Sequence, residues 1–396
     1  MPALPFLEAR ATVLREIRSR PRTPRTELVA LGQAQGRILA EDLAADRDYP
    51  PFDRAMRDGF AVHAADIPGT VRLIGEVRAG SGFQGRAGAG EAVEIMTGAP
   101  VPEGLTAVVM VEHCRRDDDG AISTDRSLPR GANIAPRGCE ARAGQVLASR
   151  GDRIDYATVS LLAATGHAEV RVFEKPRVAI LPTGDEIVGV EETPGPQQIR
   201  NSNAWSLAAQ VERAGGIPVL LPIAPDVQRA TRLLIEEGLR ADLLLLSGGV
   251  SAGKYDVVEL ALAELGAEFY FDRVLIQPGQ PLVFGRAREK FFFGLPGNPG
   301  STMVTFEVFA RAAVELLSGA TEASLPMTLA RLTRPFRHKT GLTRFLPATL
   351  SCLEITPVDW QGSGDVPALS RANAFLVADA ERAEYAAGDL IPVLPK

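Results

Sequence analysis

The sequence predicts a multidomain α/β protein, and three observations lead to that prediction. Residues 177–317 alternate continuous apolar segments with amphipathic ones, as in a mostly parallel sheet whose two faces are covered by helices. Residues 46–140 instead contain short alternating segments separated by Gly, Pro and Asp, which is typical of a β-rich module. Residues 327–396 return to short β segments and turns, so we expect a small barrel or sandwich there.

The composition is that of a globular protein with several hydrophobic cores. The chain has 396 residues, of which 45% are hydrophobic and 23% are charged, and this length favours about two to four domains. A net charge of −6 argues against a nucleic acid or an anionic membrane as partner, and no apolar run approaches the ~18 residues of a membrane span. The three cysteines are too scattered for a disulfide framework, and the N-terminus shows no secretory pattern. We therefore expect a cytoplasmic protein.

The N-terminal half is expected to contain an insertion. Apolar residues at helical spacing predict a short amphipathic helix over 6–18, and a further helix is expected within 151–170. The β-rich module lies between these two segments. It is therefore predicted to be inserted between two pieces of one small domain.

The α/β region is predicted element by element from its apolar runs. Helices are expected at 203–214, at 226–238 with Asp226 opening the helix, at 255–265 and from Pro299 to Leu317. In an open parallel sheet, ligands bind beyond the carboxyl ends of the strands. The strands are expected at 177–181, 217–223, 242–247, 267–276, 281–285 and 290–295.

Four clusters of Gly, Pro and Asp follow apolar strands. Glycine permits positive φ and close backbone approach, and consecutive N–H groups form an anion-binding concavity. Any one cluster is equally well explained as an ordinary turn, but several that converge on one sheet edge favour a binding site. The clusters are EIMTGAPVP (94–102), LPTGDEI (181–187), SGGVSAGKYD (247–256) and GLPGNPGST (294–302).

Two familiar motifs overlap in the third cluster, and both are incomplete. Gly248 to Lys254 spells a P-loop, but Tyr255 stands where a Ser or Thr hydroxyl would bind Mg²⁺. Residues 249–253 spell the G-x-S-x-G of serine hydrolases, for which only His338 follows as a base. Both readings share a glycine-rich cradle after a buried strand, and that cradle is what we predict.

Five carboxylates border these turns or a strand end. Oxygen ligands without imidazole or thiolate suit a hard ion such as Mg²⁺, held together with substrate phosphates. The alternative for each is a helix N-cap or an Asx-turn, and this alternative explains Glu186 least well. The five are Asp58, Asp185, Glu186, Asp226 and Asp256.

Eight segments, in order over more than 300 residues, resemble the molybdopterin molybdenumtransferases, also known as the gephyrin E-domain family. Each segment alone is weak evidence, whereas the ordered set is highly specific. Besides the four clusters, with the last one extended to residue 304, they are PPFDRAMRDGFAV (50–62), IRNSN (199–203), QPGQPLVFG (277–285) and GSGDVPALSRANAFL (362–376).

The resemblance implies an elongated homodimer with four domains per subunit. A discontinuous linker domain would comprise 1–46 and 141–176, and an inserted β-rich domain 47–140. A molybdopterin-binding three-layer α/β domain with a mostly parallel sheet would span 177–326. A C-terminal β-barrel-like domain would span 327–396.

The resemblance also implies the chemistry. Such enzymes use Mg²⁺ to cleave the phosphoanhydride of adenylylated molybdopterin, place molybdenum from molybdate on the dithiolene and release AMP. Glu186 and Asp256 would hold Mg²⁺, Asp226 would line the cleft, and Asp58 and Thr97 would reach in from the partner subunit; these five are the expected catalytic residues. The implied partners are the upstream adenylyltransferase and recipient molybdoenzymes. The expected substrate-binding residues are Ser247, Gly248, Gly249, Ser251, Lys254, Pro296, Gly297, Asn298, Pro299 and Ser301.

One departure from the family pattern leaves functions other than molybdenum transfer open. Gln277 and Gln280 stand where the family usually has lysines, which predicts weaker binding of molybdate unless Lys254 or Arg273 compensates. A catalytically weak cofactor-binding or scaffold protein of the same family is the main alternative. The upstream adenylyltransferase or a pyrophosphatase-like relative is less favoured, because about 180 residues precede the α/β region.

Overall fold

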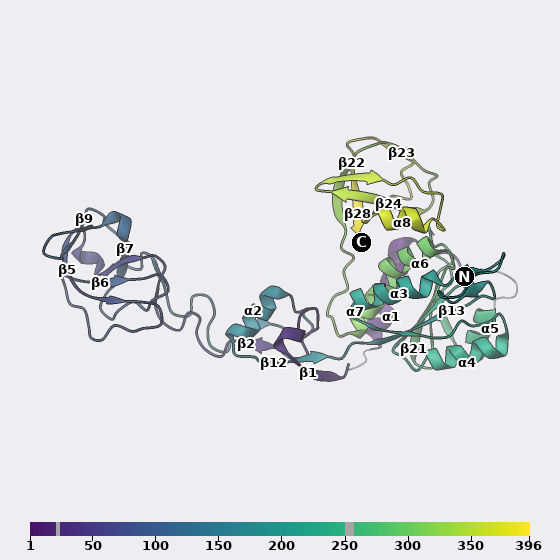
Figure 1. The fold of residues 1–396 in the computed structure, drawn as a ribbon, viewed down its shortest axis with the longest axis horizontal. Coiled ribbons are helices and arrows are strands. Elements are labelled where there is room, and N and C mark those ends of the chain that lie inside the picture. Colours follow the sequence, from purple (N-terminus) through teal and green to yellow (C-terminus); the bar gives the residue numbers. More distant parts are fainter. Residues whose placement is uncertain (21–23, 250–256) are drawn as a thin grey trace. The chain divides into compact units, whose positions relative to one another are not determined.

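The computed structural model, drawn as a ribbon in Figure 1, describes residues 1–20, 24–249 and 257–396. The chain divides into two compact units. The first unit contains 1–40, 151–156 and 169–396, and the second contains 41–150 and 157–168. Within the described ranges, no helix has the length and apolarity needed to cross a membrane.

The first unit is built on a six-stranded sheet with strand order β16-β13-β17-β21-β20-β18. Strand β13 pairs in parallel with β16 and β17, and β17 pairs in parallel with β21. Strand β20 is antiparallel to both of its neighbours, β21 and β18, so it alone runs against the other strands of this sheet, and the expectation of a mostly parallel sheet is confirmed. The strands are β13 (Arg177–Pro182), β16 (Ile217–Leu220), β17 (Leu243–Ser247), β18 (Glu268–Phe271), β20 (Val283–Ala287) and β21 (Lys290–Leu295).

Helices cover both faces of this sheet. They bury the side chains of β17, which is apolar on both faces. Leu243 and Leu245 belong to one hydrophobic core, and Leu244 and Leu246 belong to the other, as the two-residue period of a strand requires. The first core includes α3 (Ser202–Arg213) and the long helix 299–317, and the second includes α4 (Gln228–Gly238) and α5 (Val257–Glu264). The long helix consists of α6 (Pro299–Thr305), a π-helical segment (Phe306–Ala310) and α7 (Arg311–Leu317).

Two expected elements differ from the structure. Helix α4 begins at Gln228 with Val227 as its N-cap, so Asp226 does not open it. The single strand expected over 267–276 ends at Phe271, and β19 (Ile276–Gln277) instead joins the sheet of the C-terminal domain. A polar pair, Asp272 and Arg273, separates the two apolar runs.

Helix α1 (Phe6–Ser19) packs into the core of the α/β domain. Its residues Phe6, Ala9, Val13 and Ile17 are buried there, and the ring centroid of Phe6 lies 5.8 Å from that of Phe309. The boundaries of the four domains stay a proposal, and α1 lies in the first piece of the expected linker domain.

The buried guanidinium of Arg10 fixes α1 to the long helix. It donates hydrogen bonds to the carbonyl oxygens of Val308 and Ala323, each at 2.6 Å. Val308 lies in the π-helical segment, where the regular pattern of carbonyl acceptors is altered.

The C-terminal domain is a small β barrel. Strand β24 pairs with β25 and β26, and the ring closes through β25–β22, β22–β28 and β28–β26. Its elements are β22 (Thr328–Leu332), β23 (Phe336–Arg337), β24 (Thr343–Ser351), β25 (Glu354–Pro357), α8 (Val366–Arg371), β26 (Ala374–Ala378), β27 (Glu384–Tyr385) and β28 (Leu390–Pro395).

The second unit is β-rich and contains a six-stranded sheet with order β7-β4-β6-β5-β9-β8. These strands are β4 (Gly59–Val62), β5 (Gly69–Val77), β6 (Glu91–Ile95), β7 (Ala107–Met110), β8 (Arg115–Arg116) and β9 (Ile122–Thr124). Shorter elements of the two units are β1 (Thr26–Ala30), β2 (Leu43–Ala44), β3 (Arg54–Ala55), β10 (Ile134–Ala135), β11 (Val146–Ala148), α2 (Tyr156–Ala164), β12 (Glu169–Phe173), β14 (Ile187–Val188) and β15 (Ile199–Arg200).

Candidate active site

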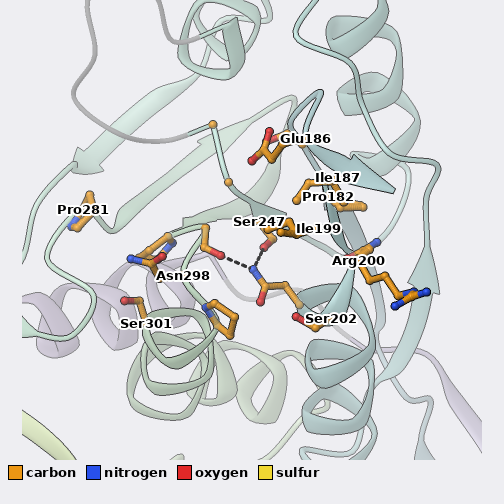
Figure 2. A pocket seen from close by; sticks show the side chains of 18 residues that line it. Pro182, Glu186, Ile187, Ile199, Arg200, Ser202, Ser247, Pro281, Asn298 and Ser301 are labelled. Carbon is orange, nitrogen blue, oxygen red and sulfur yellow. Dashed lines mark hydrogen bonds between the residues drawn. The ribbon is translucent and has the colours of Figure 1, made fainter. Parts of the chain in front are cut away.

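A pocket of about 430 Å³ lies where β13, β17 and β21 end. These strands are neighbours in the parallel sheet, so the loops that follow them meet at one edge. We call it the loop pocket (Figure 2). Its lining residues are Pro182, Thr183, Glu186, Ile187, Ile199, Arg200, Asn201, Ser202, Asn203, Ser247, Gly248, Gly249, Pro281, Pro296, Gly297, Asn298, Pro299 and Ser301.

The turn after β17 requires its two glycines. Gly248 and Gly249 have φ of +94° and +63°, in the region that favours glycine. A Cβ on Gly248 would lie 2.7 Å from the carbonyl oxygen of Thr183, and one on Gly249 would lie 2.7 Å from its Oγ1. The absence of side chains therefore lets this turn pack directly against the loop that follows β13.

The side-chain amide of Asn203 links two of the three loops. Its Nδ2 donates to Ser247 Oγ at 2.9 Å and to the carbonyl oxygen of Gly297 at 2.7 Å. Asn203 is held at the start of α3, where Asn201 caps the helix by accepting a hydrogen bond from the N–H of Ala204 at 3.1 Å. In the sequence, Asn203 stands out only as part of the IRNSN motif, which assigns it no role.

The loop after β21 is held by the helix that follows it and by the C-terminal domain. The carbonyl oxygen of Asn298 accepts hydrogen bonds from the N–H and the Oγ1 of Thr302, at 3.0 and 3.1 Å. The N–H of Gly300 donates to the carbonyl oxygen of Ser363 at 2.7 Å. Asn298 and Ser301 are therefore presented from a well-fixed backbone.

Two charged side chains line the loop pocket in the part of the chain that the structure describes. The Glu186 carboxylate lies over Gly184, where a Cβ would be 2.4 Å from Glu186 Oε2. Arg200 donates from its Nε to the carbonyl oxygen of Glu192 at 3.0 Å. Figure 2 shows Glu186 and Arg200 across the pocket from Pro281 and Ser301. Arg200 belongs to the same IRNSN motif as Asn203 and likewise was not predicted as a site residue.

The donor set of the loop pocket suits a metal ion that arrives with a phosphate. Among the described residues, no three His, Cys, Asp or Glu side chains are grouped as a ready metal site. Mg²⁺ is commonly bound through one or two carboxylates together with substrate phosphates and water. Glu186 supplies one such carboxylate, and Asp256, the second expected ligand, lies outside the described residues.

Most of the expected site residues that the structure describes in the first unit lie at the loop pocket. Asp226 does not line it, and its backbone N–H donates to Asp185 Oδ1 at 3.0 Å. Ser251 and Lys254 lie outside the described residues, as does Asp256. Those that line the pocket are Glu186, Ser247, Gly248, Gly249, Pro296, Gly297, Asn298, Pro299 and Ser301.

Asp58 and Thr97 form an exposed pair in the second unit. They lie at the same end of neighbouring strands, because Gly59 pairs with Ile95 across β4 and β6. Asp58 Oδ1 accepts hydrogen bonds from Thr97 Oγ1 at 2.7 Å and from its N–H at 2.6 Å. The hydroxyl donor first, and then the backbone donor, hold the pKa of Asp58 below its ordinary value.

Comparisons with known proteins match the whole chain to one family. Three family models cover it: the MoeA N-terminal region (domain I and II) at 4–166, the probable molybdopterin binding domain at 179–316, and the MoeA C-terminal region (domain IV) at 329–396. A Bacillus subtilis protein named molybdopterin molybdenumtransferase is 36% identical over 93% of this chain and 89% of its own length. A Haemophilus influenzae protein of the same name is 31% identical over 98% and 97%.

Solved structures agree with the sequence relatives. The crystal structure of a molybdopterin biosynthesis moeA protein from Pyrococcus horikoshii OT3 matches with a TM-score of 0.83 and 28% identity, covering 100% of both chains. A second structure of a moeA protein from the same organism matches with a TM-score of 0.76 and 30% identity, over 100% of this chain and 99% of that one. The chain therefore belongs to the molybdopterin molybdenumtransferases, an enzyme family of molybdenum-cofactor biosynthesis.

Proposed function

We propose that the chain transfers molybdenum from molybdate to adenylylated molybdopterin, with Mg²⁺-dependent release of AMP. The observation that carries this proposal is the loop pocket, where three loops from one sheet edge meet beside one carboxylate and one guanidinium. A phosphoanhydride needs donors for its oxygens and a divalent ion to offset its charge, and the pocket supplies residues for both. The name of the Bacillus subtilis relative supports the pterin and molybdenum substrates.

The donors of the loop pocket divide between hydroxyl and backbone groups. The hydroxyls of Ser247 and Ser301 and the backbone of the Gly248–Gly249 turn would hold the oxygens of phosphate and molybdate. Arg200 would pair with a phosphate oxygen, because its planar guanidinium suits phosphate geometry. A site with few fixed cations also lets a dianion such as molybdate enter and leave.

Glu186 would be the carboxylate that holds Mg²⁺, and Asp256 is proposed as a second ligand. When it is bound, Mg²⁺ offsets the negative charge that develops as the anhydride bond breaks. The Glu186 carboxylate lies close to the backbone at Gly184.

We further propose that Asp58 and Thr97 of the partner subunit complete the site in a homodimer. The two hydrogen bonds that Thr97 donates to Asp58 hold an exposed carboxylate in its ionised form, which supports a role toward a ligand from outside their own unit. The upstream adenylyltransferase and recipient molybdoenzymes remain the proposed partners. A reducing, cytoplasmic location is supported by the three cysteines, which are all free.

The direct test is an incubation of the purified protein with adenylylated molybdopterin, molybdate and Mg²⁺. We expect AMP to be released, as measured by chromatography, and an apo-molybdoenzyme to be activated by the product. A folded preparation that releases no AMP would reject the proposal.

The family's scaffold role is the second candidate, and one observation favours it. Gln277 and Gln280 replace the lysines usual in the family, which removes one cation from the end of β19 and one from the loop that follows it. A protein that binds adenylylated molybdopterin tightly but releases no AMP, with or without molybdate, would support this candidate over the first.

A further inference from the structure

Three consecutive exposed residues, Met56 to Asp58, form a charged edge of the second unit. The residues on either side of them, Ala55 and Gly59, are buried. We call these three residues the edge segment. Its central residue, Arg57, has no part in the site as proposed so far.

The backbone of the edge segment is fixed at both of its ends. The N–H of Met56 donates to the carbonyl oxygen of Asn133 at 2.9 Å. At the other end, the carbonyl oxygen of Asp58 accepts the N–H of Val111 at 3.1 Å. Arg57 therefore extends from a rigid backbone, and only its side chain has to be ordered when it binds a ligand.

The guanidinium of Arg57 has no counter-charge among the residues that the structure describes. Two other arginines of the same unit are neutralised in ion pairs. Arg54 pairs with Glu140 at 2.7 Å, and Arg137 pairs with Asp48 at 2.7 Å. Since no protein acceptor takes up its N–H groups, the guanidinium of Arg57 can offer its five donors to a ligand.

Asp58 leaves this guanidinium free, although it is the next residue in the chain. The groups that lower the pKa of Asp58 both belong to Thr97, and Arg57 is not among them. The edge segment thus carries an anion and a cation that do not neutralise each other. A guanidinium suits the oxygens of phosphate and similar oxyanions, which it can bind through two parallel hydrogen bonds.

Large apolar side chains border these charges. Met56 is 53% exposed, and Val111, which binds the backbone of Asp58, is 49% exposed. Methionine and arginine are both enriched where protein surfaces meet. The edge segment therefore has the composition of a contact surface, which suits the second copy of the chain that the proposed homodimer supplies.

The loop pocket needs more positive charge than its described lining holds. Glu186 and Arg200 are the charged members of that lining, and their formal charges cancel. Molybdate is a dianion, and each phosphate group of the anhydride is also charged, so a single Mg²⁺ would not fully offset them. A cation from a second subunit would improve the electrostatic match.

We infer that Arg57 is an oxyanion-binding residue that each subunit supplies to the loop pocket of its partner, beside Asp58 and Thr97. This inference rests on the proposed function, in which the second unit of one subunit completes the site of the other, and it adds a cation to that half of the site. The oxyanion is molybdate or a phosphate of the adenylylated pterin, which share a tetrahedral arrangement of oxygens.

The first test titrates two probes, molybdate and AMP, calorimetrically into the full-length chain and its Arg57→Gln variant. Loss of a charge-assisted hydrogen bond should weaken at least one probe roughly tenfold, and the affected probe identifies the oxyanion. Arg57→Lys keeps the charge without the planar fork, so it should recover part of the affinity. Added salt should reduce the difference between the parent and Arg57→Gln, which a change in packing alone would not produce.

Arg130→Gln is the matched control. Arg130 is another exposed arginine of the second unit without a counter-charge among the described residues. It lies toward the opposite end of β4 from Asp58, because the N–H of Gly131 donates to the carbonyl oxygen of Thr106, and the N–H of Thr106 donates to that of Val62. We expect Arg130→Gln to bind both probes as the parent does.

The second test asks whether Arg57 acts across the dimer. Arg57→Gln and Glu186→Gln subunits are exchanged, and AMP release is measured well below the KM of the Arg57→Gln protein. In a mixed dimer, the intact loop pocket of the Arg57→Gln subunit would receive Arg57 from the Glu186→Gln subunit. We expect release with the KM of the parent to appear, and its absence would overturn the inference.

The inference is also overturned if neither probe binds the parent, or if Arg57→Gln weakens both probes no more than Arg130→Gln does. Both residues are exposed, so the two variants should unfold at the Tm of the parent. AMP release by the parent without these binding effects removes only this inference. Binding effects in a parent that releases no AMP remove only the proposed reaction.

Discussion

The side-chain amide of Asn203 lies 2.9 Å from the hydroxyl oxygen of Ser247 and donates a hydrogen bond to it. The same nitrogen donates to the carbonyl oxygen of Gly297. Ser247 is the last residue of β17, and Gly297 follows β21, so one amide at the start of α3 sets the spacing of two neighbouring loops. Asn203 acts through these loops and is therefore a positioning residue.

Asn203→Ala is predicted to remove both hydrogen bonds. At about 0.5–1.5 kcal/mol each, the free energy of unfolding should fall by about 1–3 kcal/mol. AMP release should fall roughly tenfold, mainly through a higher KM, because the two loops lose their fixed spacing. Steady-state kinetics and chemical denaturation measure the two effects.

Gln210→Ala is the matched control for Asn203→Ala. Gln210 lies on the same helix, and its amide also makes two hydrogen bonds, to Met303 O at 3.2 Å and to Glu307 Oε1 at 2.7 Å, away from the loop pocket. We expect a similar loss of stability with near-normal KM. Equal kinetics in both variants would show that Asn203 contributes only stability.

Glu186→Gln is predicted to abolish Mg²⁺-dependent AMP release. The substitution keeps the size of the side chain but removes the charge that would hold the ion, so the rate should fall roughly a hundredfold or more. Glu186 is exposed, and the free energy of unfolding should change by less than about 0.5 kcal/mol. Glu191→Gln, on an exposed neighbour outside the pocket, should be active. Retained release in Glu186→Gln at ordinary Mg²⁺ would exclude this carboxylate as a ligand.

A mixture of two inactive variants should regain activity if the site is shared between subunits. Asp58→Asn and Glu186→Gln each damage a different half of the proposed site. A mixed dimer then has one intact site, so random exchange of subunits should restore about a quarter of normal AMP release. Subunits are exchanged by partial denaturation and refolding, and each variant treated alone is the control. A mixture no more active than its components would place Asp58 outside a shared site.

Thr97→Val is predicted to raise the pKa of Asp58 toward its ordinary value. The hydroxyl of Thr97 is the largest cause of the lowered pKa, and its backbone N–H would remain as a smaller one. Because the folded-state pKa is depressed, the pair stabilises the protein fully above the ordinary aspartate pKa of about 3.9, and this contribution is lost as the pH falls through the folded-state value. The stability difference between parent and variant should therefore be constant above pH 5 and shrink below pH 4. A difference that grows at low pH would contradict the assignment.

Thiol labelling at pH 8 is predicted to distinguish Cys114 from the other cysteines. Burial raises the pKa of the Cys114 thiol to about 11, so little reactive thiolate is present at that pH. Cys139 and Cys352 are exposed and should react promptly. The absorbance of a chromogenic disulfide reagent follows the rates, and labelling in denaturant gives the full count. Rapid reaction of all three cysteines in the folded protein would show that Cys114 is accessible.

The layout of the α/β domain was predictable because its strands are encoded locally. The run from Leu243 to Leu246 is continuously apolar, and it becomes a central strand with one pair of leucines on each face. The glycines that follow this strand likewise predicted a tight turn. Both features depend on neighbouring residues and little else.

Features that depend on distant residues were not predictable. Asn203 meets Ser247 and Gly297 from 44 and 94 positions away along the chain, so no local pattern marks its role. Asp226 has the sequence context of a helix cap, but the structure starts the helix two residues later. No local pattern predicts the π-helical segment. The carbonyl oxygen of Val308 in that segment accepts a hydrogen bond from Arg10, which lies nearly three hundred residues earlier in the chain.

That last contact bears on how the protein can be cut into fragments. A shortened polypeptide that starts at Arg177 would retain every strand of the parallel sheet, yet it would lack Phe6, Val13 and Ile17 from the core and Arg10 from the long helix. An apolar trench would open along that helix, and such surfaces promote aggregation. Expression of the α/β and C-terminal domains alone therefore calls for a design that grafts the opening nineteen residues back onto them.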